Sequence, residues 1–161
     1  MSIEAVRSYF RPLGRETDIL EFSESSATVE LAAQAVGVIP ARIAKSLSFL
    51  TPEGCVLIIA AGDARVDNSK YKHHFGVKAK MLTPEQVVEY TGHAIGGVCP
   101  FAISRPDVRI YLDISLQRFD TVFPAAGSAN SAIELTCVEL EQYACNCQGW
   151  ADLCKGWQTE E

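Results

Sequence analysis

One lysine, Lys45, stands alone inside an apolar stretch that runs from residue 43 to residue 50. A turn at 51–54 and a second apolar run at 55–61 follow, so the sequence predicts a β-hairpin with the lysine in its first strand. A buried ammonium group needs a partner or a shifted pKa. Such a lysine therefore either extends its charge to the surface or faces a cleft that receives an anion. The strand alone leaves both interpretations open.

A glycine pair, Gly96 and Gly97, lies between two apolar stretches and is followed by Pro100. Paired glycines let backbone N–H groups approach a ligand closely, and proline fixes the exit of the loop, although an ordinary turn has the same pattern. Cys99 lies inside this loop, and a nucleophilic thiol needs an adjacent base. Nothing in the sequence brings His93 or another histidine to that thiol, so we expect no covalent catalysis.

A basic segment follows the hairpin. It spans residues 70–80 and contains Lys70, Lys72, His73, His74, Lys78 and Lys80. The whole chain has a net charge of −6. Most charge runs are solvated helix faces. An acidic protein that concentrates positive charge in one segment favours the other interpretation, a patch that contacts phosphate groups.

The composition is that of an ordinary globular protein. The chain has 161 residues, 48% hydrophobic and 21% charged, which predicts a single domain over residues 1–161. No apolar run approaches the length of a membrane span, and the N-terminus lacks a signal-peptide pattern, so we expect a cytoplasmic protein without a membrane partner. The negative net charge argues against binding along DNA.

Six cysteines without a signal peptide are typical of free thiols rather than of a disulfide framework. Four of them lie in the C-terminal quarter, at positions 137, 145, 147 and 154. Structural zinc sites usually use pairs separated by two residues, and Cys145 and Cys147 are separated by one, so we expect no metal. The tail 145–161 carries two tryptophans, which predicts that it docks on its own domain.

Helices and strands are expected throughout the chain. Helices are predicted at about 3–13, 27–36 with Ser26 as its cap, 68–75, 84–91 and 137–143, the last two opened by capping boxes. Strands are predicted at 19–22, 44–50, 55–61, 109–113, 121–124 and 132–135. Hairpins with interspersed helices and no regular βαβ alternation indicate an α+β domain on a mixed sheet.

Three separated stretches of the sequence, 44–47, 96–101 and 126–135, form a joint pattern. In this order and spacing they resemble the YbaK and prolyl-tRNA synthetase editing-domain family of aminoacyl-tRNA deacylases, over roughly residues 20–145. The resemblance implies a mixed, largely antiparallel and barrel-like sheet with flanking helices. It also implies hydrolysis of the ester between a wrong amino acid and the 3′ end of a tRNA, commonly the proline tRNA, without metal or cofactor. Prolyl-tRNA synthetase is then a possible partner.

The resemblance also implies roles for individual residues. Lys45 matches the strand lysine that anchors the tRNA 3′ end, and the amides of Gly96 and Gly97 match those that hold the ester carbonyl. The implied substrate-binding residues are Pro100, Phe101, Gly127, Ser128, Asn130 and Ser131, and the expected tRNA contacts are Lys70, Lys72, His73, Lys78 and Lys80. Some family members place a histidine where this chain has serine and asparagine, so no general base is evident. Water activation then rests on backbone groups or on the tRNA's own neighbouring hydroxyl.

Two other functions stay open at this point. The first is a binding module that keeps the pocket but has lost turnover and senses charged tRNA or joins a synthetase complex. The second is hydrolysis of a small ester or nucleotide without tRNA, which would leave the basic segment unexplained. The identity of the amino acid also stays open, because a synthetase pocket cannot strongly reject a near-isostere of its own substrate.

Overall fold

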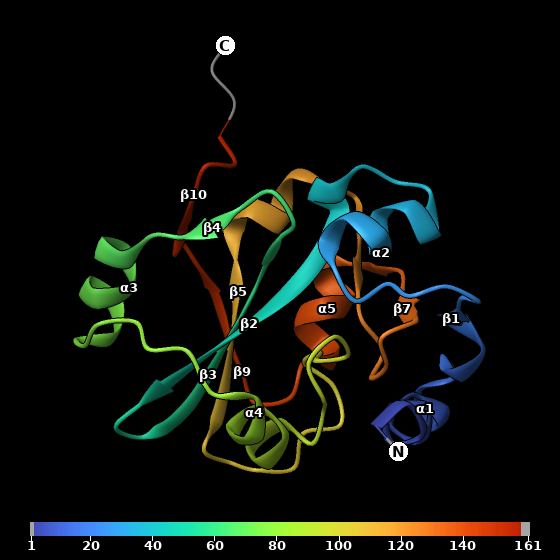
Figure 1. The fold of residues 1–161 in the computed structure, drawn as a ribbon, viewed down its shortest axis with the longest axis horizontal. Coiled ribbons are helices and arrows are strands. Elements are labelled where there is room, and N and C mark those ends of the chain that lie inside the picture. Colours follow the sequence, from blue (N-terminus) through green and yellow to red (C-terminus); the bar gives the residue numbers. More distant parts are fainter. Residues whose placement is uncertain (1, 159–161) are drawn as a thin grey trace.

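The computed structural model describes residues 2–158, which fold around a curled six-stranded sheet (Figure 1). In spatial order its strands are β8 (Leu135–Thr136), β6 (Thr121–Pro124), β2 (Ile43–Thr51), β3 (Gly54–Ala61), β5 (Val108–Asp113) and β9 (Cys147–Ala151). Two further pairs lie beside it: β1 (Ile19–Glu21) with β7 (Ser131–Ile133), and β4 (Arg65–Val66) with β10 (Cys154–Lys155).

Parallel and antiparallel pairings are mixed in this sheet. The pairs β2–β3 and β6–β8 are antiparallel, whereas β2–β6, β3–β5 and β5–β9 are parallel. Both two-stranded pairs are antiparallel. The predicted α+β class with a mixed sheet is therefore confirmed. Antiparallel pairings are in the majority only when the two-stranded pairs are included, because three of the five pairings in the six-stranded sheet are parallel.

The predicted hairpin forms the centre of the sheet. Strands β2 and β3 pair from Ala44–Ala61 to Thr51–Gly54. Gly54 closes the turn at φ +132°, and a Cβ there would lie 2.4 Å from the carbonyl oxygen of Asp107. Every residue of β3 is buried because strands and packed segments cover both of its faces.

Five helices surround the sheet: α1 (Ser2–Phe10), α2 (Val29–Val36), α3 (Asn68–Phe75), α4 (Pro84–Thr91) and α5 (Cys137–Tyr143). The predicted capping boxes of α4 and α5 are confirmed, with Thr83 and Thr136 as caps. The predicted cap of α2 is wrong. Thr28 caps that helix, whereas the amide and hydroxyl of Ser26 both donate to the carbonyl oxygen of Ala129.

Two further expectations need adjustment. The first helix ends at Phe10 and continues as a 3₁₀ turn, Arg11–Leu13, before Gly14 at φ +73°. The strand expected at 132–135 is divided at Glu134 into β7 and β8, which pair with different neighbours. Splitting at one residue lets the chain leave one sheet and enter the next.

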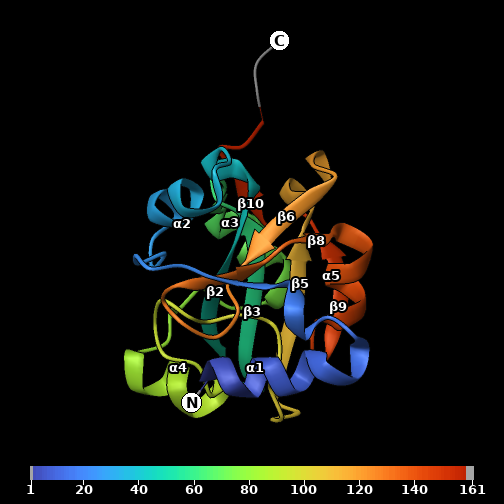
Figure 2. The same ribbon diagram turned by 90° about the vertical axis from the view of Figure 1, so that its right-hand side faces the viewer.

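The tail docks on its own domain, as predicted. Its strand β9 pairs with β5, and β10 pairs with β4. The guanidinium of Arg118 stacks on Trp157 with its carbon 5.0 Å from the ring centre. Figure 2 shows α1 and α4 together at one end of the sheet and α5 beside β9. None of the described helices combines the length and apolar character that crossing a bilayer requires. All six cysteines are free thiols.

Candidate functional site

The candidate site lies where the outer edge of β2 loses its pairing. At one end, Ile43 and Ala44 pair with β6. At the other end, the amide of Leu50 donates to the carbonyl of Lys80 over 2.7 Å, and Leu82 donates to Ser48 over 3.3 Å. Between these two contacts the three residues 45–47 have no strand on that side within the described chain.

A cavity of about 280 Å³ opens over this gap. Its floor is β2 from Ile43 to Ser48, and its walls are the approach to α2 at 26–29, the glycine loop at 95–98 and the segment 81–82. Ser131 and Ala132 of β7 also line the cavity. Four stretches that are far apart in sequence therefore meet at the unpaired edge.

Lys45 is the only ionisable side chain among the described residues that line this cavity. It is partly buried, and its Nζ donates to the carbonyl of Gly62 over 3.2 Å. Burial is the main cause that lowers the pKa of Lys45 from its ordinary value near 10.5, and the neighbouring Arg65 acts in the same direction. A desolvated cation with one neutral partner can still bind an anion or polarise a carbonyl group.

The glycine loop meets the cavity through Gly96 and Val98. Gly96 has φ +96°, and a Cβ there would lie 3.3 Å from the Cβ of Ala27. The amide of Gly97 was expected to hold the ester carbonyl. In the structure it donates to the carbonyl of Ala94 over 2.9 Å, so this amide is already engaged. No hydrogen bond within residues 2–158 uses the amides of Gly96 or Val98, so these two are the candidate donors.

Gly97 lies where two loops approach each other closely. A Cβ at this position would lie 2.7 Å from the amide nitrogen of Ser128 and 2.8 Å from the carbonyl carbon of Gly127. Both atoms belong to backbone, which cannot move aside cheaply. The glycine loop and the 127–131 loop can therefore approach each other this closely only because Gly97 has no side chain.

Pro100 and Phe101 lie behind the glycine loop rather than in the cavity wall. Phe101 is fully buried, with its ring centre 4.8 Å from that of Phe10. The carbonyl of Pro100 accepts from the amide of Cys145 over 2.8 Å. Neither residue is among those that line the cavity, so the expected direct contact with substrate stays a prediction that this placement does not favour.

His93 supports the same loop. It is buried, its Nε2 lies 2.7 Å from the carbonyl oxygen of Phe101, and its Nδ1 is hydrogen-bonded to the hydroxyl of Ser2. Burial lowers the pKa of His93, so the neutral ring donates from Nε2 and accepts from Ser2. The ring therefore ties the start of α1 to the exit of the glycine loop.

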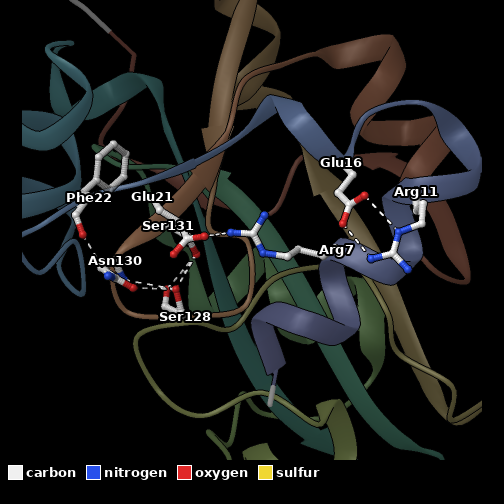
Figure 3. A network of polar contacts seen from close by, with 8 residues as sticks. All are labelled: Arg7, Arg11, Glu16, Glu21, Phe22, Ser128, Asn130 and Ser131. Atoms are coloured by element: carbon white, nitrogen blue, oxygen red, sulfur yellow. Dashed lines mark hydrogen bonds and ion pairs between the residues drawn. The ribbon is translucent and has the colours of Figure 1, made fainter.

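Ser131 belongs to a network of polar side chains with Ser128 and Asn130 (Figure 3). Ser128 Oγ donates to Asn130 Oδ1 over 2.9 Å and lies 2.7 Å from Ser131 Oγ. Asn130 Nδ2 donates to the carbonyl of Phe22 over 2.9 Å. Of the predicted wall residues, Ser131 lines the cavity, whereas Ser128 and Asn130 position it and Gly127 packs on α1. Ser128 donates its only hydroxyl proton to Asn130, so Ser131 is the donor in the hydrogen bond between the two serines. The lone pairs of the Ser131 hydroxyl therefore accept no hydrogen bond within the described chain.

Cys99 does not line the cavity. It is completely buried, and burial raises the pKa of its thiol to about 12, although its Sγ lies 3.5 Å from His93 Nε2. A thiol of this kind is not a nucleophile at neutral pH. Within residues 2–158 no group of three or more His, Cys, Asp and Glu side chains could hold a metal ion.

The basic segment runs from α3 toward the site along the edge of β2 (Figure 1). Lys72, His73, Lys78 and Lys80 are exposed. Lys70 differs, because its Nζ is bonded to Asp152 over 2.8 Å and to the carbonyl of Cys154 over 3.0 Å. Its charge is therefore matched within the protein.

Most lining residues were not predicted as site residues from the sequence, and three of these are notable. Ser46 carries a buried hydroxyl without a hydrogen-bond partner in the described chain. Met81 and Ile95 are each 64% exposed at the rim of the cavity. Ser46 follows Lys45 directly and could have been noted, whereas no local pattern distinguishes Met81 and Ile95 from ordinary loop residues.

Comparison with known proteins gives a consistent result. Residues 23–143 match the family model described as the aminoacyl-tRNA editing domain. The chain is 55% identical over 160 residues to the uncharacterized protein YwhH of Bacillus subtilis, covering 98% of this chain and 100% of that one. A solved structure proposed to be a trans-editing enzyme for prolyl-tRNA synthetase is similar over 96% of this chain and 98% of its own, with a TM-score of 0.85 and 34% identity.

Other relatives match over part of their length only. The multifunctional Ser/Thr-tRNA deacylase ProXp-y of Escherichia coli is 32% identical over 82 residues, which are 50% of this chain and 48% of that protein. The proline–tRNA ligase of Thermotoga maritima is 31% identical over 91 residues, which are 56% of this chain, and the match spans only 15% of the ligase.

Proposed function

The chain belongs to the aminoacyl-tRNA editing-domain family, and from this premise we propose that it is a trans-acting deacylase that hydrolyses the ester of a mischarged tRNA. The finer proposal is that its substrate is a proline tRNA carrying a small wrong amino acid, in the cytoplasm and in association with prolyl-tRNA synthetase. One observation carries the proposal: a cavity that joins Lys45 to free backbone amides and contains no other ionisable side chain among its described residues.

This cavity suits an ester that is already reactive. Water adds to the ester carbonyl carbon, and the amides of Gly96 and Val98 stabilise the negative charge that develops on the carbonyl oxygen. The bond to the ribose oxygen then breaks, and that oxygen takes up a proton, which releases the amino acid and the tRNA. Lys45 anchors the 3′ end electrostatically, so that the ester is held against the amides.

Lys45 is the only ionisable side chain of the described cavity, and in this proposal its protonated form anchors the tRNA, so no other side chain is left to act as a general base. The vicinal hydroxyl of the terminal ribose is the base or relay that the substrate itself supplies. A tRNA with a 2′-deoxy terminal adenosine is then bound but not deacylated. Turnover of that tRNA at the normal rate would assign water activation to the protein backbone.

The size and lining of the cavity support a small amino acid. Its volume of about 280 Å³ is at the lower end for ligand sites. Ala27, Ala32, Ala44 and Val98 offer an apolar wall, while Ser46 and Ser131 offer hydroxyl oxygens. Alanine and 2-aminobutyrate fit the apolar wall, and serine, threonine and cysteine could use the hydroxyl groups.

The test is a deacylation assay on proline tRNA that carries alanine, cysteine, serine, threonine or 2-aminobutyrate, with prolyl-tRNA as control. We expect one or more mischarged species to be hydrolysed, proline to be spared, and Lys45→Ala to lose the activity. Lys155→Ala is the matched variant, since Lys155 is exposed and lies outside the cavity. Binding of charged tRNA without hydrolysis of any species would contradict the enzyme and favour a sensing module.

A further inference from the structure

A second cavity of about 350 Å³ adjoins the first. The two cavities share Lys45, Leu47 and Met81, which form a ridge between them. The second cavity has an apolar floor that includes Phe49, and a polar rim formed by Lys45, Arg65 and Asn68. It is also within the size range of ligand sites. Any ligand that fills both cavities must pass over Lys45.

Arg65 is distinctive among the arginines. The chain has eight, and within residues 2–158 the other seven each form an ion pair with an acidic side chain, whereas Arg65 forms none. Its guanidinium lies beside Gly156, at the rim of the cavity, and close enough to Lys45 to affect that lysine's charge. Two cations thus face a cavity without an acid between them.

Two acidic side chains near this rim, Asp63 and Asp67, are already engaged, and Glu30 is a third acid that acts on Lys45. Asp63 is paired with Arg118 over 2.6 Å. Asp67 caps α3 by accepting from the amides of Ser69 and Lys70. Asn68, next in the chain, is exposed, and its side chain makes no hydrogen bond within the described part of the protein. Its amide is free to donate to and accept from the edge of a base.

We propose that the second cavity binds the nucleotide that precedes the terminal adenosine of the tRNA, which is a cytidylate. This inference rests on the proposed function. With the aminoacyl end of the terminal adenosine in the first cavity, the phosphodiester crosses the ridge between Lys45 and Arg65, where the positive charge is unmatched. The cytosine lies against Leu47 and Met81 and presents its hydrogen-bonding edge to Asn68. RNA-binding proteins commonly read splayed single-stranded bases by hydrogen bonds to the base edge, and in this cavity the aliphatic side chains of Leu47 and Met81 would take the place of the usual aromatic stacking surface.

Exposed lysines extend the same path. Ala79 and Met81 line the second cavity, and the exposed Lys78 and Lys80 alternate with them in an extended segment. Successive side chains of an extended segment point to opposite sides, so Lys78 and Lys80 face away from the cavity and can contact only those phosphates of the acceptor end that lie beyond the segment. The second cavity connects the catalytic cavity with the basic segment that was predicted to contact tRNA.

The experiment compares binding of the dinucleotide CpA with binding of adenosine by calorimetry at one fixed salt concentration, because the 5′-phosphate of AMP would occupy the same place as the phosphodiester. Contact with one additional base contributes a factor of about 5 to 150 in affinity. We expect CpA to bind at least about 5-fold more tightly than adenosine, and Arg65→Ala to remove most of this advantage while adenosine binding is unchanged. Asn68→Ala should reduce the preference for CpA over UpA. Lys155→Ala is the control, because Lys155 pairs with Arg65 across β4 and β10 but does not line the cavity.

Three results would overturn the inference: equal affinity for CpA and adenosine, an equal loss of both ligands in Arg65→Ala, or the same loss in Lys155→Ala. These binding measurements do not depend on turnover. A protein that binds CpA through Arg65 but deacylates no tRNA would retain the nucleotide site and lose the proposed enzymatic function. A deacylase with equal affinities would retain the function and lose the site.

Discussion

Replacing Gly97 by alanine tests whether the close contact between the glycine loop and the 127–131 loop positions the site, because the substitution removes no chemical group. The new Cβ would lie 2.7 Å from the amide nitrogen of Ser128, and an ordinary contact begins near 3.4 Å, so the two loops must separate by about 0.7 Å. Overpacking of this kind costs about 1–3 kcal/mol of stability. A displacement near 1 Å in a catalytic arrangement lowers the rate by about 10²-fold, so we expect kcat to fall by one to two orders of magnitude.

Gly92→Ala is the matched variant for this experiment. Gly92 ends α4 at φ +75°, and a Cβ added there would meet no atom within 4 Å, so its replacement costs only the left-handed conformation, about 1–2 kcal/mol. Urea denaturation should show similar losses for both variants, while single-turnover deacylation should be impaired in Gly97→Ala alone. Wild-type kcat in Gly97→Ala, or an equal loss of kcat in Gly92→Ala, would refute the reasoning that contact between the two loops positions the site.

Three other predictions concern groups outside the cavity. Burial holds the pKa of His93 below its ordinary value near 6.5, so on acidification the unfolded chain is protonated at this residue before the folded protein is. As far as His93 is concerned, the free energy of unfolding has its full value above about pH 6.5 and decreases below that pH by at most about 1.4 kcal/mol per pH unit. His93→Gln should abolish this pH dependence in urea titrations, and an unchanged slope would contradict it. The buried hydroxyl of Tyr71 lacks a partner within residues 2–158, so Tyr71→Phe should raise the free energy of unfolding by about 1 kcal/mol, and a loss would mean that the hydroxyl is satisfied. The double variant Lys78→Ala, Lys80→Ala should reduce the slope of log affinity for tRNA against log salt concentration by about 1 to 2. Lys70→Ala should change this slope little, because Lys70 is paired with Asp152. Equal effects of the two variants on the slope would contradict this distinction.

The elements that the sequence predicted well are those specified by neighbouring residues. The hairpin around residues 51–54 and the capping boxes at Thr83 and Thr136 depend on contacts three or four positions apart, and all three are present. The prediction of Ser26 as a cap is wrong because Ala129, which accepts its hydrogen bonds, is distant in sequence. A serine before a helix has the same local pattern whether it binds its own helix or another loop.

The candidate site was predicted by resemblance more than by chemistry. Lys45 could be singled out from its apolar strand, but its place in a cavity depends on contacts with residues far along the chain. The positions of Gly97 and Phe101 show the limit of this approach. A glycine needed for a loop contact and a glycine needed for ligand approach look alike in a sequence, as do a buried phenylalanine and one in a binding wall.

The position of the cavity nevertheless has a local cause that can be traced to two prolines. Strand β6 pairs with β2 only as far as Pro124, opposite Ala44, and proline has no amide hydrogen with which to extend the ladder. From the other side, the segment that pairs with Ser48 and Leu50 turns away after Leu82, because Thr83 and Pro84 begin α4.

Between these two stops, the edge of β2 is open for three residues. Backbone groups alternate in direction along a strand, and those of Ser48 and Leu50 face outward, so the amide and carbonyl of Ser46 face the gap as well. An unpaired strand edge attracts polar partners, and here the neighbouring Lys45 adds a positive charge. The lone lysine and the missing strand are therefore parts of one feature: the interruption of pairing leaves the space, and the lysine beside it is the reason why we propose an anion or a polarised carbonyl group as the ligand.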